Sequence, residues 1–301
     1  MRLNLRAFWS LALLVLSVSV FATPPTPAFW KATSGQNTIY LLGSIHYGAR
    51  DFYPLPPEIE TAFRASDGLF VELDLMKESA TIAFKMLTLG ALPKDKTIWD
   101  FLTPETATLL KEKLSQLGIP EGTVEKVKPW TVSLNLSLLA MNVDHLGLSA
   151  TYGIDNYFIQ QAYKMKLPVH ALERVDEQLA VFDGLSYEKQ DALLRETLKQ
   201  LDKNAAQFNE LYQSWRKGDV EQLKKIIRGQ LSDPDTTDFY NRLTTKRDKR
   251  MADRLLAYLA KHPGQYFVVV GAAHLVDDTS LLHHLKRAGY QIERVKLRKG
   301  E

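Results

Sequence analysis

The fold is decided by one stretch of the sequence, QYFVVVGAAH, which spans residues 265–274. Its first part is the most apolar of the candidate strands, and such a run is typical of a strand buried on both faces. The run leads directly into a Gly-x-x-His motif made by Gly271 and His274. The stretch therefore predicts a buried strand with a histidine just beyond its carboxyl end.

The same pattern occurs a second time near the start of the chain. The residues LLGSIH, at positions 41–46, again run from an apolar strand into Gly-x-x-His, with Gly43 and His46. A polar segment and then a helix follow in both copies. This echo indicates two related half-units, although two matches this short can also arise by chance.

Expected strands and helices alternate along the rest of the chain. A turn-rich tetrad, SGQN at 34–37, joins two strand segments and predicts a hairpin. The other expected strands cover residues 68–74, 168–173 and 291–297, the last at a sheet edge. The expected helices cover residues 56–65, 279–287 and two mainly helical blocks, 78–166 and 176–261, the second with a break at 232–235.

This alternation predicts an α/β fold, with α+β as the alternative. We expect a central mixed sheet built from two related half-units, with large helical insertions. No linker rich in Pro, Gly or Ser divides residues 23–301, so a single domain is expected. A chain of 301 residues is long enough to bury a large core without disulfides.

The composition excludes several classes of function. Basic residues number 38 and acidic residues 35, so the formal charge of +3 gives no electrostatic footprint for nucleic acid. The absence of cysteine excludes disulfide scaffolds, thiolate zinc sites, cysteine nucleophiles and iron–sulfur clusters. The sequence also lacks the His-Glu-x-x-His, Gly-x-Ser-x-Gly, phosphate-loop and dinucleotide-binding motifs.

Residues 1–22 have the layout of a secretory signal peptide. Arg2 and Arg6 precede an apolar run over residues 7–21, and residues 20–22 offer a cleavage point. The run is shorter than the ~20 residues that cross a bilayer comfortably, and an uncleaved anchor is the alternative. No later stretch is long and apolar enough to span a membrane. We therefore expect export to a bacterial periplasm.

The expected strands end on side chains that bind metals or transfer protons. These are His46, Glu72 with Asp74, Glu173 and His274. In open α/β sheets, ligands gather at the carboxyl ends of strands. Two histidines and a carboxylate are a common ligand set for catalytic Zn²⁺ and other divalent metals. Since such a metal lowers the pKa of a bound water toward neutrality, the pattern predicts hydrolysis of amides or esters.

Simpler structural interpretations stay open for the acidic residues. Glu72 could be half of a buried ion pair with an arginine such as Arg64. Glu173 could form an ordinary salt bridge with its neighbour Arg174. Asp74 could be the metal ligand itself or a carboxylate that orients the first histidine.

A basic run, KRDKR at 246–250, is most simply a solvated helix face. One inward-facing arginine from it, Arg247 or Arg250, could hold a carboxylate or a developing oxyanion. His283 and His284 are neighbours on an expected helix and point in different directions, so surface positions are expected for them.

The ordered set of motifs resembles the TraB/GumN family, whose animal relatives are the Tiki membrane-anchored metalloproteases. The resemblance rests on LGSIH at 42–46, FVELD at 70–74, ALE at 171–173 with EQL at 177–179, and VGAAHL at 270–275. It covers nearly the whole chain after the predicted signal peptide. It implies a fold akin to the erythromycin-esterase and ChaN-like proteins, and divalent-metal-dependent proteolysis as in the Tiki branch.

Carried over to this sequence, the resemblance implies a metal site of His46 and His274, with Glu72 as the acid. The ion would be zinc, manganese or cobalt. Glu72 or Glu173 would serve as general base, and Arg247 would stabilise the oxyanion of a peptide or protein substrate.

Two points leave alternatives to this interpretation. Bacterial members of the family usually carry Arg-Asn before the last motif, whereas here Asp248 follows the arginine and adds a negative charge. The same pocket could also be a binding module without turnover, for a peptide or an iron-porphyrin, as the ChaN-like relatives suggest. A purely structural domain is the third alternative.

Overall fold

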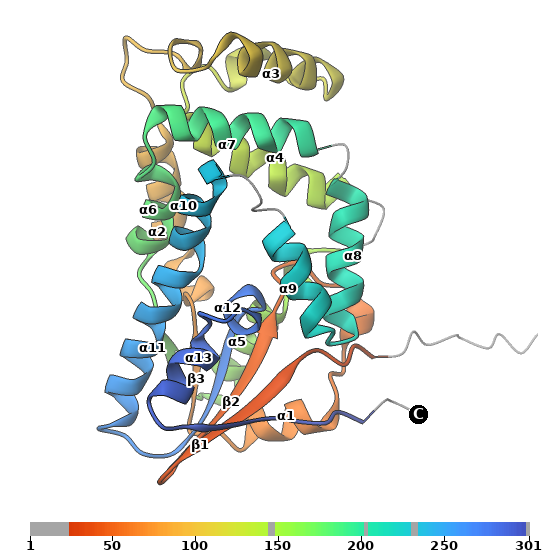
Figure 1. The fold of residues 1–301 in the computed structure, drawn as a ribbon, viewed down its shortest axis with the longest axis vertical. Helices are drawn as coiled ribbons and strands as arrows, with labels where there is room; N and C mark the ends of the chain where they lie inside the picture. The colour runs from red at the N-terminus through yellow and green to blue at the C-terminus, as the bar shows by residue number, and fades with distance from the viewer. Residues whose placement is uncertain (1–23, 144–147, 202–203, 230–233, 299–301) are drawn as a thin grey trace, which may run out of the picture.

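Six strands form one mixed sheet, and helices surround it (Figure 1). The computed structural model describes residues 24–143, 148–201, 204–229 and 234–298. The predicted signal peptide, residues 1–22, lies outside the described residues. Across the described ranges, no helix combines the length and the apolar character that crossing a membrane requires.

The element bounds follow the predicted alternation of strands and helices. The strands are β1 (Phe29–Ser34), β2 (Asn37–Ser44), β3 (Gly68–Val71), β4 (Val169–Ala171), β5 (Gln265–Gly271) and β6 (Gln291–Arg294). The helices up to β4 are α1 (Pro57–Arg64), α2 (Leu75–Gly90), α3 (Pro104–Gln116), α4 (Pro129–Val143) and α5 (Ile154–Met165). The later helices are α6 (Val175–Asp183), α7 (Tyr187–Gln200), α8 (Asn204–Arg216), α9 (Val220–Gly229), α10 (Pro234–Leu243), α11 (Thr245–Leu259), α12 (Ala273–Val276) and α13 (Leu281–Arg287). The predicted break at 232–235 lies mainly outside the described residues.

The strands follow the order β4-β3-β5-β2-β1-β6 across the sheet. The first four in this order are parallel to one another, whereas β1 runs antiparallel to both β2 and β6. This mixed sheet, interleaved with helices, confirms the predicted α/β fold. β5 lies inside the sheet with five consecutive buried residues, as its apolar sequence predicts, and β6 lies at the edge.

The strand predicted over residues 68–74 is shorter than expected, because β3 ends at Val71. Three residues later the chain turns into α2. Asp74 is the N-cap of that helix, and its carboxylate accepts a hydrogen bond from the Lys77 amide at 3.2 Å. A side chain that caps a helix in this way favours a turn over a continued strand.

Helices cover both faces of the sheet, since successive strand residues point to opposite faces. On one face, Phe63 of α1 and Phe158 of α5 contact Phe267 of β5. On the other face, Tyr258 of α11 packs edge-on against Tyr266, the neighbouring residue of β5. Helices α5 and α11 therefore approach the sheet from opposite sides.

The two Gly-x-x-His segments lie side by side, because β2 and β5 are adjacent and parallel. In the register of this pair, Ser44 lies opposite Gly271, so the echo is offset by one residue. The first motif leaves its strand into an irregular segment, whereas the second enters α12.

A second group of helices lies beyond the sheet and encloses its own apolar cluster (Figure 1). Most of its buried leucines come from α3, α4 and α7, and α7 contacts both α3 and α4. These helices belong to the large insertions predicted between the strands.

Candidate functional site

Four of the predicted site residues follow strands that end at the same edge of the sheet. Strands β2, β3, β4 and β5 are parallel, so their carboxyl ends share this edge. The chain continues there into His46, Glu72, Glu173 and His274. The exits of β3 and β4 are joined directly, because the Glu173 amide donates to the Glu72 carbonyl at 2.9 Å.

The two glutamates share one buried arginine. Nη2 of Arg247 donates to Oε2 of Glu72 and to Oε2 of Glu173, both at 2.6 Å, and Nε donates to Glu173 at 3.0 and 3.1 Å. The side-chain amide of Gln178 also donates to both carboxylates, at 3.1 Å to Glu72 and 3.0 Å to Glu173. A positive charge on α11 thus stabilises two negative charges that follow adjacent strands.

The partners suggested by sequence proximity are wrong. Arg64 pairs with Glu60 on its own helix, and Arg174 pairs with Glu177 in the first turn of α6. An ion pair of Glu72 with an arginine does exist, but the arginine is Arg247 of α11.

Electrostatic interactions keep Glu72 ionised. Burial raises the pKa of this carboxyl, but four neighbours outweigh that effect and lower the pKa to about 2. In order of size they are His274, Arg247, His46 and the Gly271 amide, which donates to Oε1 at 2.7 Å. Burial also opposes the charge of Arg247, but the two carboxylates hold the pKa of its guanidinium above the usual value.

His274 lies between two acids. Its Nδ1 is 2.5 Å from Oδ1 of Asp248, and its Nε2 is 3.6 Å from Oε1 of Glu72. Asp248 is completely buried, and its Oδ2 has no hydrogen-bond partner within the described part of the chain. Burial raises the pKa of Asp248 against the opposing effects of His274 and Arg247.

His46 has a comparable partner on the other helix that approaches the site. Its Nδ1 lies 3.0 Å from Oδ2 of Asp155 in α5, and Ser44 Oγ donates to the other oxygen of Asp155 at 2.7 Å. The charge of Asp155 raises the pKa of His46 to about 9. The His46 side chain is 66% exposed, whereas that of Asp155 is 9% exposed.

Sequence reasoning did not single out Asp155. It included Gln178 only within the EQL stretch of the family resemblance, and it noted Asp248 only as a departure from the family pattern. Asp155 and His46 are 109 positions apart, and only the packing of α5 on the sheet joins them. Asp74, considered as a ligand or an orienter of His46, instead caps α2 and accepts a hydrogen bond from Tyr163 at 2.6 Å.

Glycines let the backbone segments of the site approach closely. A Cβ at Gly43 would lie 3.1 Å from the Cα of Ala272 on the neighbouring chain segment. A Cβ at Gly153 would lie only 2.2 Å from the carbonyl oxygen of His46. The glycine before α5 therefore fixes how closely that helix approaches the segment that carries His46.

The donor types of His46, His274 and Glu72 suit zinc, manganese or cobalt. The 3.6 Å between Nε2 of His274 and Oε1 of Glu72 is close to the ~3.4 Å expected for two ligands ~2.1 Å from one tetrahedral ion. Within the ranges that the structure describes, no group of three or more His, Asp or Glu side chains is already placed to hold an ion. The chain thus presents two donors, His274 and Glu72, at a suitable separation. His46 does not form one ligand group with them among the described residues.

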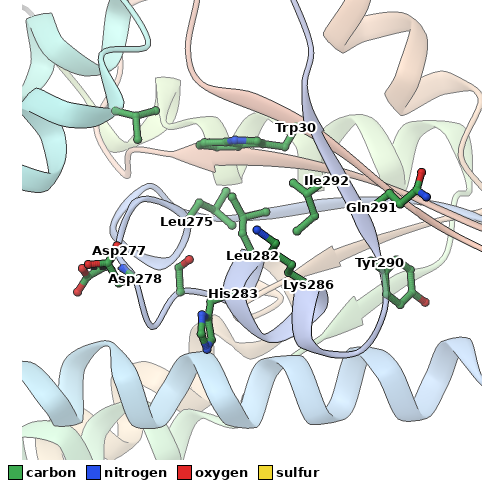
Figure 2. A pocket seen from close by; sticks show the side chains of 12 residues that line it. Trp30, Leu275, Asp277, Asp278, Leu282, His283, Lys286, Tyr290, Gln291 and Ile292 are labelled. Carbon is green, nitrogen blue, oxygen red and sulfur yellow. Dashed lines mark hydrogen bonds between the residues drawn. The ribbon is translucent and has the colours of Figure 1, made fainter.

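A pocket of about 760 Å³ lies elsewhere, against β1, β6, α12 and α13 (Figure 2). Trp30, Leu275 and Ile292 contribute apolar surface, and His283 and Lys286 contribute polar groups. None of the predicted site residues lines this pocket. The candidate chemistry therefore belongs to the strand ends, where acids, an arginine and histidines converge.

Known proteins match this chain over most of its length. Residues 28–294 match the TraB/PrgY/gumN family. Over 260 residues the chain is 28% identical to the uncharacterized protein YbaP of Escherichia coli, covering 86% of this chain and 92% of YbaP. It is 27% identical over 303 residues to the metalloprotease TIKI2 of Danio rerio, covering 84% of this chain and 58% of TIKI2.

The metalloprotease TIKI1 of Homo sapiens is 23% identical over 303 residues, with 84% of this chain and 59% of TIKI1 covered. The chain therefore spans about three fifths of the length of these Tiki proteins. No solved structure matches the chain. The family match extends from β1 to β6 and includes every strand and every side chain of the site, so the chain belongs to the TraB/PrgY/gumN family.

Proposed function

We propose that this protein is an exported metal-dependent hydrolase, and that it acts as a peptidase at the carboxyl edge of the sheet. The observation that carries the proposal is the position of Nε2 of His274, 3.6 Å from Oε1 of the ionised Glu72. The Tiki relatives are named metalloproteases, which supports metal-dependent peptide hydrolysis as the reaction class.

In this proposal His46, His274 and Glu72 hold the ion. When bound, a divalent metal lowers the pKa of a water molecule and polarises a substrate carbonyl. A low pKa keeps Glu72 ionised, which suits a ligand better than a proton acceptor. The ligand role therefore goes to Glu72 and leaves the role of general base to Glu173.

Both oxygens of Glu173 accept hydrogen bonds from Arg247, and its side chain has no exposed surface. Glu173 can take a proton once Arg247 turns toward the developing oxyanion of the substrate, which is the role predicted for this arginine. Arg250, whose Nη2 lies 3.7 Å from Glu173 and whose side chain is 39% exposed, is the alternative partner for the oxyanion.

The test combines metal analysis with peptide cleavage. We expect the purified protein, reconstituted with Zn²⁺, Mn²⁺ or Co²⁺, to retain stoichiometric metal and to cleave unfolded peptides until a chelator is added. The double variant His46→Ala/His274→Ala should lose both properties, whereas His283→Ala, an exposed histidine outside the site, should keep both. Equal metal content in the double variant, or cleavage that a chelator does not stop, would refute the proposal.

A non-catalytic binding site for a peptide or an iron-porphyrin is the second candidate. The exposed ring of His46 favours it, because an accessible imidazole can serve as an axial ligand. Adding haem should then produce a visible absorption band that His46→Ala abolishes. The protein should cleave no peptide after reconstitution with Zn²⁺, Mn²⁺ or Co²⁺.

Export is proposed from residues 1–22, which have the basic, apolar and small-residue parts of a signal peptide. Protein recovered from the periplasmic fraction of a bacterial host should begin near Thr23 by mass spectrometry. Retention of Met1 in the membrane fraction would indicate an uncleaved anchor instead.

A further inference from the structure

We infer that Asp155 and Asp248 are a matched pair of positioning residues, each of which holds Nδ1 of one site histidine so that Nε2 is left to bind a ligand. The nature of that ligand rests on the proposed metal-dependent function. The orientation of the two rings rests only on the contacts of the chain itself.

The first pair joins α5 to the segment after β2. Oδ2 of Asp155 lies 3.0 Å from Nδ1 of His46, and Ser44 Oγ donates a hydrogen bond to Oδ1 of Asp155 at 2.7 Å. Ser44 is the second residue of the Gly-x-x-His motif, so the motif supplies both the histidine and a group that fixes its carboxylate partner. Gly153 allows α5 to begin against the His46 carbonyl, where any Cβ would clash.

The second pair joins α11 to α12. Oδ1 of Asp248 faces Nδ1 of His274 at 2.5 Å, and both side chains are buried. The neighbouring residue on α11, Arg247, holds Glu72, which faces the other nitrogen of His274. Helix α11 therefore carries Asp248, which contacts Nδ1 of His274, and also Arg247, which holds Glu72 near Nε2 of the same ring.

The choice of nitrogen follows from elementary chemistry. An ionised carboxylate only accepts hydrogen bonds, so a ring nitrogen held by one carries the proton. The other nitrogen is then the one that can bind a metal once the ring is neutral, as in carboxylate–histidine–metal arrangements. In both pairs here the carboxylate takes Nδ1, so Nε2 is the nitrogen left available in both rings.

The two pairs are related by position but differ in one detail. The two histidines follow the adjacent parallel strands β2 and β5. The helices that carry the aspartates, α5 and α11, pack on opposite faces of the sheet. Where the first motif has Ser44, the second has Ala272, which has no donor on its side chain. Correspondingly, both oxygens of Asp155 are bound, whereas Oδ2 of Asp248 has no hydrogen-bond partner in the described ranges.

The direct test is proton NMR of the metal-free protein with ¹⁵N-labelled histidine. We expect two ring N–H signals downfield of the amide region, each from an Nδ1 held by a carboxylate. Asp155→Ala should remove only the signal of His46, and Asp248→Ala only that of His274. Persistence of either signal in its own alanine variant would overturn the inference for that pair.

If an alanine variant does not fold, the asparagine variant at the same position provides the test. In Asp155→Asn and Asp248→Asn the side-chain amide can accept from Nδ1 through its oxygen or donate to it through its nitrogen, so the signal of that ring should shift or disappear while the other signal stays. A matched control is Asp191→Asn, a buried aspartate of α7 that bonds Thr103 and Arg195 and should leave both signals unchanged. An unchanged signal in the asparagine variant of a folded protein would contradict the assignment.

A second readout separates this inference from the proposed function. Co²⁺ titration followed by visible absorption should show a tenfold to hundredfold weaker affinity in the alanine variants, as is usual when the partner of a ligating histidine is removed. If the wild-type protein binds no metal but the two signals respond as expected, the proposed function fails and the positioning roles stand. If Co²⁺ affinity is unchanged in both alanine variants, the positioning roles fail and the metal site stands.

Discussion

Removal of the Arg247 guanidinium should cost ~3–5 kcal/mol of unfolding free energy at neutral pH, the range seen when one partner of a buried ion pair is deleted. The side chain of Arg247 is 7% exposed, and those of Glu72 and Glu173 are 10% and 0% exposed. In Arg247→Met most of the apolar volume remains, but two buried carboxylates face each other without their cation. The cost therefore comes from charge and not from a cavity.

The pKa of Glu72 gives a second measure of the same effect. The pKa falls from 4.5 to about 2. Since one pKa unit corresponds to ~1.4 kcal/mol, this net shift, which already includes the opposing effect of burial, corresponds to about 3 kcal/mol. Arg247 is one of the groups that lower this pKa and also holds Glu173, so the two figures agree in order of magnitude.

The effect should depend on pH with a definite sign. A carboxyl whose folded pKa is lowered contributes its stabilisation above its unfolded pKa, here about 4.5, and loses it as the pH falls toward 2. In Arg247→Met the unpaired carboxylates can take up protons in the folded state. The difference in unfolding free energy between wild type and variant should therefore shrink as the pH falls from 7 to 4.

Urea unfolding followed by far-UV circular dichroism at pH 7 and pH 4 measures this difference. Arg250→Met is the matched control on the same helix, because its guanidinium lies 3.7 Å from Glu173 and is partly exposed. It should change the unfolding free energy by less than about 1 kcal/mol. A loss below 1 kcal/mol for Arg247→Met at pH 7, or a loss that grows at pH 4, would refute the reasoning.

Two further changes test how the backbone of the site is held. Gly153→Ala places a Cβ 2.2 Å from the His46 carbonyl oxygen. It should lower the unfolding free energy by ~1–3 kcal/mol in the urea assay. The control Gly122→Ala has open space around the new Cβ and should stay within ~0.5 kcal/mol of wild type. Trp215→Phe removes the indole donor that binds the Gly43 carbonyl at 2.7 Å and should cost ~1–3 kcal/mol, because that buried oxygen loses its partner. Equal midpoints for Gly153→Ala and Gly122→Ala, or for Trp215→Phe and wild type, would show that these contacts do not constrain the site.

The sheet and the side chains at its strand ends could be predicted because their signals are local. A short apolar run such as that of β5, rich in β-branched residues, favours a strand inside a sheet, and the residue after its carboxyl end is fixed by chain order. The parallel register of β2 and β5 then brings the two histidine motifs together without further information.

The partners of these side chains could not be predicted, because tertiary packing chooses them. Proximity in the sequence favoured Arg64 and Arg174, but each binds a glutamate within its own helical segment, where an i+3 or i+4 partner costs little entropy. Asp155 reaches His46 only after α5 docks on the sheet, a contact for which neither segment carries a sequence signal.

One feature of the chain order bears on recombination between family members. Residues 245–276 run without interruption through α11, β5 and α12, and they carry Arg247, Asp248, Gly271 and His274. The corresponding parts around His46 come instead from two separate segments of the chain. A chimera that exchanges 245–276 as one cassette keeps half of the site internally matched, whereas a crossover between α11 and β5 would pair the helix of one parent with the histidine of the other.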